Sequence, residues 1–446
     1  MRDHPAPSLI VRFLNGDLSP EEGSSVMRHL LGGCKRCLAV LAPTAGALAP
    51  AGEPEPATLD DFDLPIRRAF EAVARHGVEA PEIRAATRKL RHRMATKGLE
   101  SFDMEAYPDH AVFEALLQRI QDLRHEDPKS MVQHGYMALQ IARAMANGCD
   151  SKEEHADLQS RAMAELANAM RVADDLHEAG KTLDLAEQWY AAGTRCDLLW
   201  LRLLDVRASL YGAQQHYQDA IGLLAEVLKG RLLLGDRTGA ARALIGQGIF
   251  TAYTGQHEAA FGHFDRALSL IDSFREPSLA ALAYHNRLLF TIDLGNFKEA
   301  LDYLESNRQQ LMHSGGRLDG VKLLGLEARI QTGLGQFDLA ETLLREAKLG
   351  LVELELKGHE ALAGLDLATV ILHQDRDRYT EAVTLAVEAL RTFTQLQVKP
   401  QVVEALHVLA HAVKDGIVTA SLLQSIADFV RKAEHDRRAR YQPRFE

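Results

Sequence analysis

The sequence contains few of the residues that build disulfide frameworks or β-sheets. Its 446 residues include only 4 Cys, 14 Pro, 10 Tyr, 2 Trp and 15 Phe, which argues against a disulfide-stabilised protein and favours helix over sheet. No run of about 18 apolar residues is present to span a bilayer. The N-terminus (MRDHPAPSL) also lacks the apolar stretch of a secretory signal. We therefore expect an all-helical, cytoplasmic protein without a membrane partner.

Positive charge and catalytic motifs are also scarce. The chain has 51 Lys and Arg against 62 Asp and Glu, a formal net charge of -11, whereas general nucleic-acid binding requires a basic surface. Phosphate-binding loops, dinucleotide fingerprints, G-x-S-x-G elbows and EF-hand loops are all absent from the sequence. The sequence predicts a binding protein with no catalytic residues rather than an enzyme, and nucleic acid is not the expected partner.

An alanine- and proline-rich stretch divides the chain into two unequal parts. Residues 41–58 (LAPTAGALAPAGEPEPAT) hold 6 Ala, 4 Pro and no Lys or Arg, a composition that interrupts helices and offers little to bury. We interpret this stretch as a linker. The division predicted from the sequence is a compact module over 1–40, the linker over 41–58, a helical connector over 59–105, helical repeats over 106–430 and a basic tail over 431–446.

The region after the linker carries an internal repeat. Three copies of one pattern, a glycine, an aromatic residue or histidine two positions later and an alanine three positions after that, read GQHEAA, GNFKEA and GQFDLA. Looser copies precede and follow them. The final alanines follow one another in steps of 34, 40, 40, 40 and 42 along the chain and comprise Ala186, Ala220, Ala260, Ala300, Ala340 and Ala382. This regularity predicts one structural unit used several times.

Each residue type in the pattern has a structural reason. Glycine ends a helix in a left-handed conformation, the ring covers the gap between neighbouring helices, and the small alanine lets two helix axes approach closely. One helical hairpin cannot bury its own apolar face, so successive hairpins stack. Across about residues 180–430 the pattern resembles the tetratricopeptide repeat, although its period is about 40 rather than about 34. The expected fold is therefore an all-α superhelix of roughly eight hairpins, each helix longer than usual by nearly one turn.

The module over residues 1–40 contains a candidate metal site. His29, Cys34 and Cys37 form the pattern H-x4-C-x2-C, and His4 is the only other histidine or cysteine in this module. Two thiolates two residues apart can hold one tetrahedral ion, and structural zinc takes four such ligands. We therefore predict Zn²⁺ bound by these four residues. The alternatives are a reduced cysteine pair without metal and a redox-active dithiol.

This ligand set resembles the zinc-binding domain of bacterial anti-sigma factors, whose motif is a distant His or Cys followed by H-x3-C-x2-C. The resemblance covers only the module over 1–40, and this chain has one more residue than the motif between His29 and Cys34. It implies a sigma factor as a possible partner, wrapped with the help of a helix over 61–70. The order of module, linker and repeats also resembles bacterial tetratricopeptide-repeat proteins with an N-terminal zinc finger.

Other features favour ordinary structural explanations. Residues 84–97 hold six Lys or Arg and no acid, which is typical of a solvated helix face; contact with an acidic partner or nucleic acid is the alternative. His407 and His411 lie one helix turn apart, and we interpret them as hydrogen-bonded interface histidines. Cys149 and Cys196 have no neighbouring motif and are expected to be buried or inert.

Together these features predict a regulatory adaptor that holds a protein or peptide partner in the groove of the superhelix and sequesters it. One alternative is a regulator that senses a short peptide, which changes the pitch of the superhelix. The others are a nucleic-acid-associated factor that uses the 84–97 patch and a regulatory subunit or substrate of a neighbouring protease, cleaved in the exposed linker.

Overall fold

A computed structural model describes residues 110–123, 128–147, 149, 151–312, 317–396, 399–436 and 439–442. Within these residues the structure is helical and contains no strand, so the predicted all-α class is confirmed. The predicted zinc module, linker and helical connector and the basic patch over 84–97 lie outside the described residues. None of the described helices is long and apolar enough to cross a bilayer.

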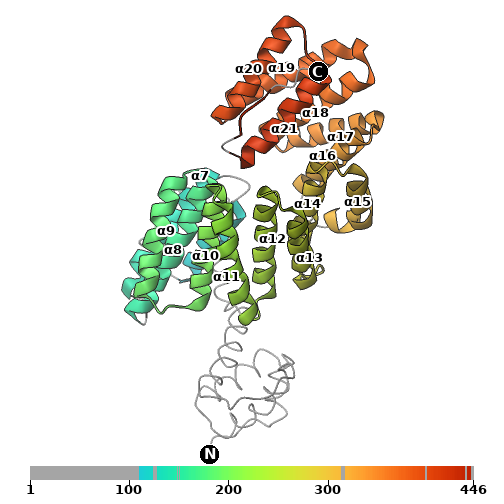
Figure 1. Ribbon diagram of the computed structural model, residues 1–446. Helices are drawn as coiled ribbons and strands as arrows, with labels where there is room; N and C mark the ends of the chain where they lie inside the picture. The colour runs from blue at the N-terminus through green and yellow to red at the C-terminus, as the bar shows by residue number, and fades with distance from the viewer. Residues whose placement is uncertain are drawn as a thin grey trace, which may run out of the picture.

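The described helices form eight hairpins, the number predicted from the repeat length. They follow an arc that begins with α6 and α7 and ends with α20 and α21 above the first half of the array (Figure 1). The helices are α6 His110–Asp122, α7 Pro128–Ala144, α8 Lys152–Val172, α9 Leu176–Ala192, α10 Asp197–Ala213, α11 Tyr217–Leu233, α12 Arg237–Tyr253, α13 His257–Leu270, α14 Pro277–Asp293, α15 Phe297–Met312, α16 Arg317–Gly333, α17 Phe337–Glu353, α18 Lys357–Gln374, α19 Tyr379–Gln395, α20 Pro400–Asp415 and α21 Ala420–His435, with short 3₁₀ helices η3 Met145–Asn147 and η4 Arg376–Arg378.

The period of the repeat has a simple origin in the helix lengths. Most helices from α9 to α19 contain 17 residues, for example α11, α12, α16 and α17. Three-residue turns such as 254–256 and 294–296 join them. Two such helices and two such turns make up one period. Each unit is therefore a pair of helices longer than those of an ordinary tetratricopeptide repeat, as predicted.

The three-residue turns share one backbone conformation. The middle residue of the turn is left-handed, with φ of 84° at Gly255 and 76° at both Gly295 and Gly335. The amide of Gly295 donates to the carbonyl of Ile292, and the next amide donates to Thr291, which satisfies carbonyls left unpaired at the end of α14. Non-glycine residues occupy the same position in other turns, with positive φ at Asp174, Gln215 and Glu355.

The predicted alanine ladder is confirmed with one change of register. The alanines at 220, 260, 300, 340 and 382 are the fourth residues of α11, α13, α15, α17 and α19, and each is fully buried. In α9, however, the fourth residue is Ala179, whereas Ala186 lies two turns further along the helix. Both alanines are buried, but Ala179 is the structural equivalent. Counting from Ala179 lengthens the first step of the ladder and brings it into line with the other steps.

The predicted boundary at residue 430 falls inside α21, which continues to His435. Apolar positions keep their helical spacing past this boundary, because Ile426, Val430 and Ala433 are all buried against the same core. Beyond the helix, Tyr441 packs edge-to-face on Phe429 with 5.2 Å between ring centroids. The predicted basic tail therefore begins later than expected, because basic residues interleaved with the last apolar positions concealed the end of the helix.

Candidate functional site: a cavity between the central repeats and the last helix

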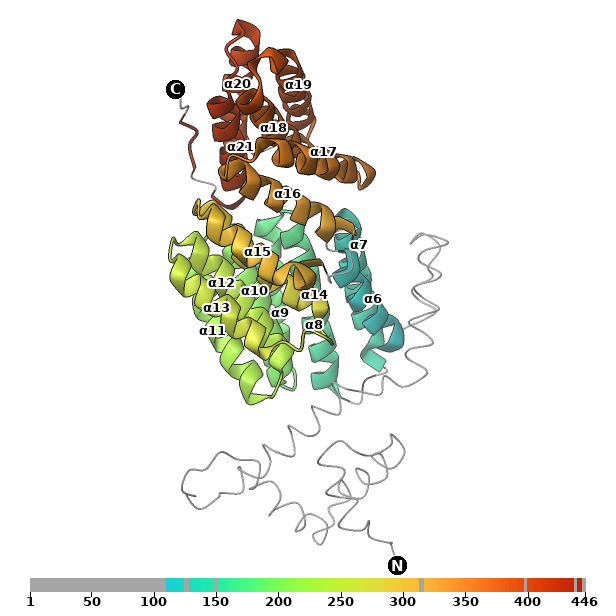
Figure 2. The ribbon, with the colours of Figure 1, turned by 90° about the vertical axis from the view of Figure 1, so that its right-hand side faces the viewer.

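A cavity of about 1210 Å³ lies where the arc brings α21 close to the central repeats. One wall consists of the ends of α10, α12, α14 and α16 with the turns and helix starts that follow them. The other consists of one face of α21 with Asp366 of α18. Figure 2 shows the C-terminal hairpins lying across the end of the α12 to α15 layer. The cavity is therefore enclosed by parts of the chain that are remote in sequence.

The first wall is built from equivalent positions of successive repeats. Tyr217, His257 and Phe297 are the first residues of α11, α13 and α15, and all three line the cavity. They occupy the aromatic or histidine position of the repeated pattern, for which the sequence predicted a packing role. Phe297 also packs: a Cβ added at Gly333 would lie only 2.3 Å from its ring. This position thus both fills the space between helices and supplies the lining of the cavity.

Aromatic rings form a continuous row along this wall. The Tyr217 ring stacks on Phe250 at 5.9 Å and lies 5.4 Å from Tyr253, which in turn meets Phe290 edge-on at 5.6 Å. Tyr217 and Tyr253 are half-buried, whereas Phe290 is buried in the core behind them. Ring contacts of this kind hold their members in place. The wall therefore presents fixed aromatic edges and faces to the cavity.

Charged side chains complete the lining. Arg329 of α16 contacts Asp293 of α14 at 2.8 Å, and Arg431 of α21 pairs with the half-buried Asp366 of α18 and with Asp428 at 3.0 Å. Burial opposes the charge on Arg431, but the nearby carboxylates, Asp366 first, raise its pKa overall. Arg431 therefore stays ionised. The cavity combines fixed charges of both signs with aromatic surface.

The last turn of α21 contacts the central repeats directly. The side-chain amide of Gln215 donates to the carbonyl of His435 at 2.9 Å, and the Tyr217 hydroxyl donates to the same carbonyl. The His435 imidazole stacks on the Tyr253 ring, with centroids 4.6 Å apart and an interplanar angle of 22°. Gln215 and His435 are 220 residues apart in sequence. This contact closes one side of the cavity.

The sequence also predicted sites other than this cavity. His4, His29, Cys34 and Cys37 lie outside the described residues, so zinc binding there stays a prediction. Among the residues that the structure describes, no group of three or more His, Cys, Asp and Glu is arranged to hold a metal ion.

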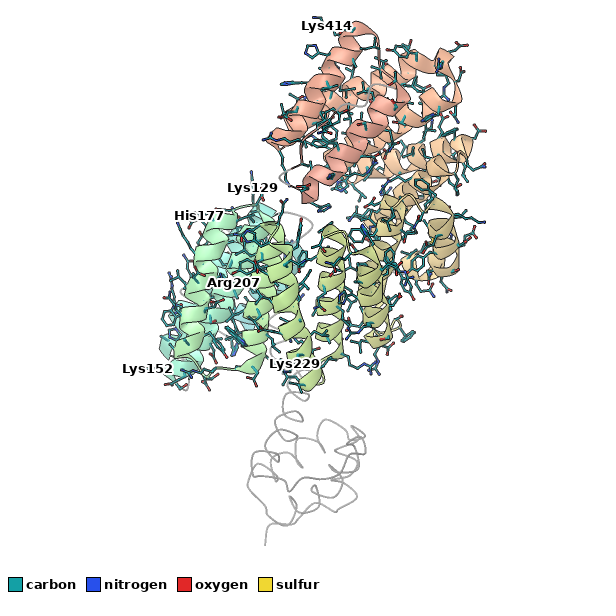
Figure 3. The ribbon with its side chains drawn as sticks, viewed as in Figure 1. Lys129, Lys152, His177, Arg207, Lys229 and Lys414 are labelled. Carbon is teal, nitrogen blue, oxygen red and sulfur yellow. The ribbon has the colours of Figure 1, made fainter. Side chains whose placement is uncertain are left out.

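The prediction of hydrogen-bonded interface histidines in α20 is wrong. His407 and His411 are both exposed, since Leu406 and Leu409 occupy the buried face of the helix. Lys414, labelled in Figure 3, lies close to His411 at the C-terminal end of α20. This end of α20 is far from the last turn of α21, which borders the cavity. A spacing of one helix turn puts two residues on one face but does not say which face is buried.

The two isolated cysteines have different surroundings. Cys149 is half-buried, and its thiol donates to the carbonyl of Met145 at 3.4 Å. Cys196 is exposed at the start of α10, so burial does not account for it.

Sequence reasoning missed the residues that α21 contributes, because 431–446 was interpreted as a tail. The aromatic position of the repeated pattern was the one signal that pointed to the other wall. Its side chain varies between repeats, as tyrosine, histidine or phenylalanine, whereas the alanine is retained in each copy.

Comparisons with known proteins show the fold. No protein-family model matches the chain, and a search of curated proteins returned no match. Among solved structures, the chain is similar to a Rap protein complexed with competence and sporulation factor (TM-score 0.51, 12% identity, 72% of this chain and 87% of that one). It is also similar to the apo form of RapI (TM-score 0.52, 11% identity, 73% of this chain and 100% of that one).

A third similar structure is a signal transduction ATPase with numerous domains from Pyrococcus horikoshii, which has a tetratricopeptide repeat sensor (TM-score 0.50, 11% identity). The alignment covers 94% of this chain and 56% of that one. At these identities the likeness establishes the architecture alone. The described chain is a superhelix of tetratricopeptide-like helical hairpins.

Proposed function

We propose that this protein is a regulatory adaptor that binds a segment of a protein or peptide partner in the cavity between the central repeats and α21. The observation that carries the proposal is the construction of the cavity wall from equivalent positions of consecutive repeats. Repeat proteins use such surfaces to follow an extended partner chain. The structurally similar Rap protein was solved as a complex with competence and sporulation factor.

The size and the lining of the cavity favour a peptide over a small molecule. Its volume of about 1210 Å³ exceeds the roughly 300–1,000 Å³ of common small-molecule pockets. The rings of Tyr217 and Tyr253 offer apolar contact, and Arg329 and Asp293 offer partners for charged groups and for peptide amides. A segment with alternating apolar and charged side chains satisfies both.

Binding without catalysis is part of this proposal, because the sequence contains none of the nucleotide-binding or nucleophile motifs considered above. Two partner classes follow from different observations. A sigma factor, sequestered by the adaptor, is favoured by the resemblance of the module over 1–40 to anti-sigma domains. A short peptide is the second candidate, and the size of the cavity with its aromatic and charged lining favours it.

A charge reversal in the cavity tests the proposal. Arg329→Glu removes the pair with Asp293 and places a negative charge in the lining. Arg308→Glu is the matched control, since it breaks a comparable pair with Glu327 between α15 and α16 at a position outside the lining. Both variants should retain their helix content by circular dichroism.

The measurement is quantitative affinity purification of the full chain from its native host. We expect the partner to be lost from Arg329→Glu and retained by Arg308→Glu. Equal recovery of the partner by both variants would refute binding in this cavity. Thermal stabilisation of the parent protein by a peptide fraction, without any co-purifying protein, would select the peptide-sensing alternative.

A further inference from the structure

The last turn of α21 makes a contact that its own fold does not require. The buried residues of α21, including Leu422, Ile426 and Val430, hold the body of the helix against α18 and its neighbours. The half-buried Arg431–Asp366 pair adds an electrostatic link to α18. His435, one turn later, is exposed and contacts the central repeats. Ala433, in the same turn, stays buried against the C-terminal core. The His435 side chain and the carbonyl at the end of the helix can therefore leave the central repeats while the residues up to Ala433 stay packed.

The central repeats meet His435 with three groups, Gln215, Tyr217 and Tyr253, which we name the docking pad. Carbonyls in the last turn of a helix have no partner within the helix. In α21 the carbonyl of His435 accepts hydrogen bonds from the Gln215 amide and the Tyr217 hydroxyl, while the side chain of His435 lies flat on Tyr253. The docking pad thus recognises a backbone carbonyl and the ring of the same residue.

None of these contacts is specific to α21. Any peptide carbonyl can accept from the same two donors, and any aromatic or imidazole side chain can stack on Tyr253. The docking pad also lines the cavity in which we place the partner segment. A partner segment that carries an aromatic residue or histidine would therefore reach the same atoms that His435 occupies.

We propose that the last turn of α21 is an intramolecular competitor for the docking pad. A partner segment with an aromatic or imidazole side chain displaces His435, so partner binding and release of the last turn of α21 are coupled. This inference rests on the proposed peptide-binding function. A tethered competitor acts at an effective concentration on the order of millimolar, so its removal should strengthen binding measurably.

The first test needs no ligand. Hydrogen exchange of the amides of residues 432–436 is measured in the full chain for the parent, for His435→Ala and for His411→Ala. The control removes an exposed histidine from the neighbouring helix α20. We expect exchange to be faster by roughly threefold to tenfold in His435→Ala and unchanged in His411→Ala. Unchanged exchange in His435→Ala overturns the closing role of the contact, whether or not a partner is ever found.

The second test uses a labelled synthetic peptide with the sequence of residues 424–436 (QSIADFVRKAEHD) as the probe. We expect it to bind His435→Ala about tenfold more tightly than the parent chain, because the tethered competitor is weakened. Adding Tyr253→Ala or the milder Tyr217→Phe should weaken that binding. Equal affinity for parent and His435→Ala, or no binding to either, overturns the competitor role. Loss of a native partner from Arg329→Glu tests the proposed function separately.

Discussion

At the scale of single residues, two adjacent alanines in α13 show how differently the same side chain is used. Ala260 is fully buried at the helix crossing, whereas Ala259 is exposed to solvent. The methyl group at 260 leaves no space between α13 and its neighbours, because protein interiors are close-packed. The repeated pattern retains alanine at the buried position for this reason.

Enlarging these two alanines should have unequal effects. We expect Ala260→Leu to destabilise the protein by about 1–3 kcal/mol through overpacking, and Ala259→Leu to change stability by less than about 0.5 kcal/mol. Urea unfolding followed by circular dichroism measures both. Similar losses in the two variants would contradict a packing role that is specific to the repeated position.

Two glycines give a second prediction for single residues. Replacing each by alanine should change the melting temperature in opposite directions. Gly295 has φ of 76° in the turn before α15, where an L-residue costs about 1–2 kcal/mol. Gly262 lies exposed inside α13, and a Cβ added there meets no heavy atom within 4 Å. We expect Gly295→Ala to lower the melting temperature and Gly262→Ala to raise it, since alanine favours helix by about 0.5–1 kcal/mol. Thermal unfolding followed by circular dichroism measures both, and shifts of the same sign would contradict the left-handed requirement at the turn.

At the scale of helices, α17, η4 and α19 are joined by a cluster of charges. Arg378 donates to Glu341 at 2.8 Å and 2.9 Å, and Arg345 contacts both Glu341 at 2.6 Å and Glu381. The hydrogen bonds from Arg378, followed by those from Arg345, lower the pKa of Glu341 from 4.5 to about 2. Because the folded protein holds this carboxylate in its ionised form, the cluster stabilises the packing of α17 on α19 at neutral pH.

The lowered pKa predicts a loss of stability in acid. The stabilisation by Glu341 is fully present above its unfolded pKa of 4.5 and is lost as the pH falls towards about 2. We expect Glu341→Gln to lower the melting temperature at pH 7 and to reduce the fall in melting temperature over that acid range. Glu346→Gln, on the exposed face of the same helix, is the control. Parallel melting curves for parent and Glu341→Gln at every pH would rule out this role.

The sequence predicted helices and their period well, because both depend on local physics. The chain reverses at each left-handed turn and buries an alanine in the next helix. The spacing of these residues therefore predicts how many hairpins form and how long each one is. The register of α9 was harder to predict, because Ala179 and Ala186 lie two turns apart on one face and both are buried. The exposure of His407 and His411 was missed because the α20 sequence was judged by spacing alone.

At the scale of the whole molecule, the cavity was not predictable from the sequence. Its two walls come from residues 214–344 and from α21 with Asp366 of α18, and their meeting depends on the small rotation that each hairpin adds to the next. No single residue encodes that rotation. The sequence marked the aromatic position of the repeat but predicted only a packing role for it, and the helix that faces it across the cavity lies up to 220 residues away.

Metal content provides a prediction for the module that precedes the repeats. We expect about one equivalent of zinc per chain, lost in the Cys34→Ser, Cys37→Ser double variant, since structural zinc requires its thiolate ligands. The melting of the repeat superhelix should not change in this variant, because repeats depend mainly on their neighbours. Parent protein without zinc would refute the metal site. A shift in the melting of the superhelix would instead indicate that the module packs against it.

The contact between His435 and the α10–α11 turn also has a consequence for the order of folding. Neighbouring hairpins can form as soon as their residues have been synthesised, since their contacts are close in sequence. The wall that α21 supplies arrives only after all the intervening hairpins have left the ribosome. During synthesis, the emerging protein therefore passes through a stage in which the aromatic row is assembled but uncovered, and chaperones or an early partner can reach it before the chain's own last helix does.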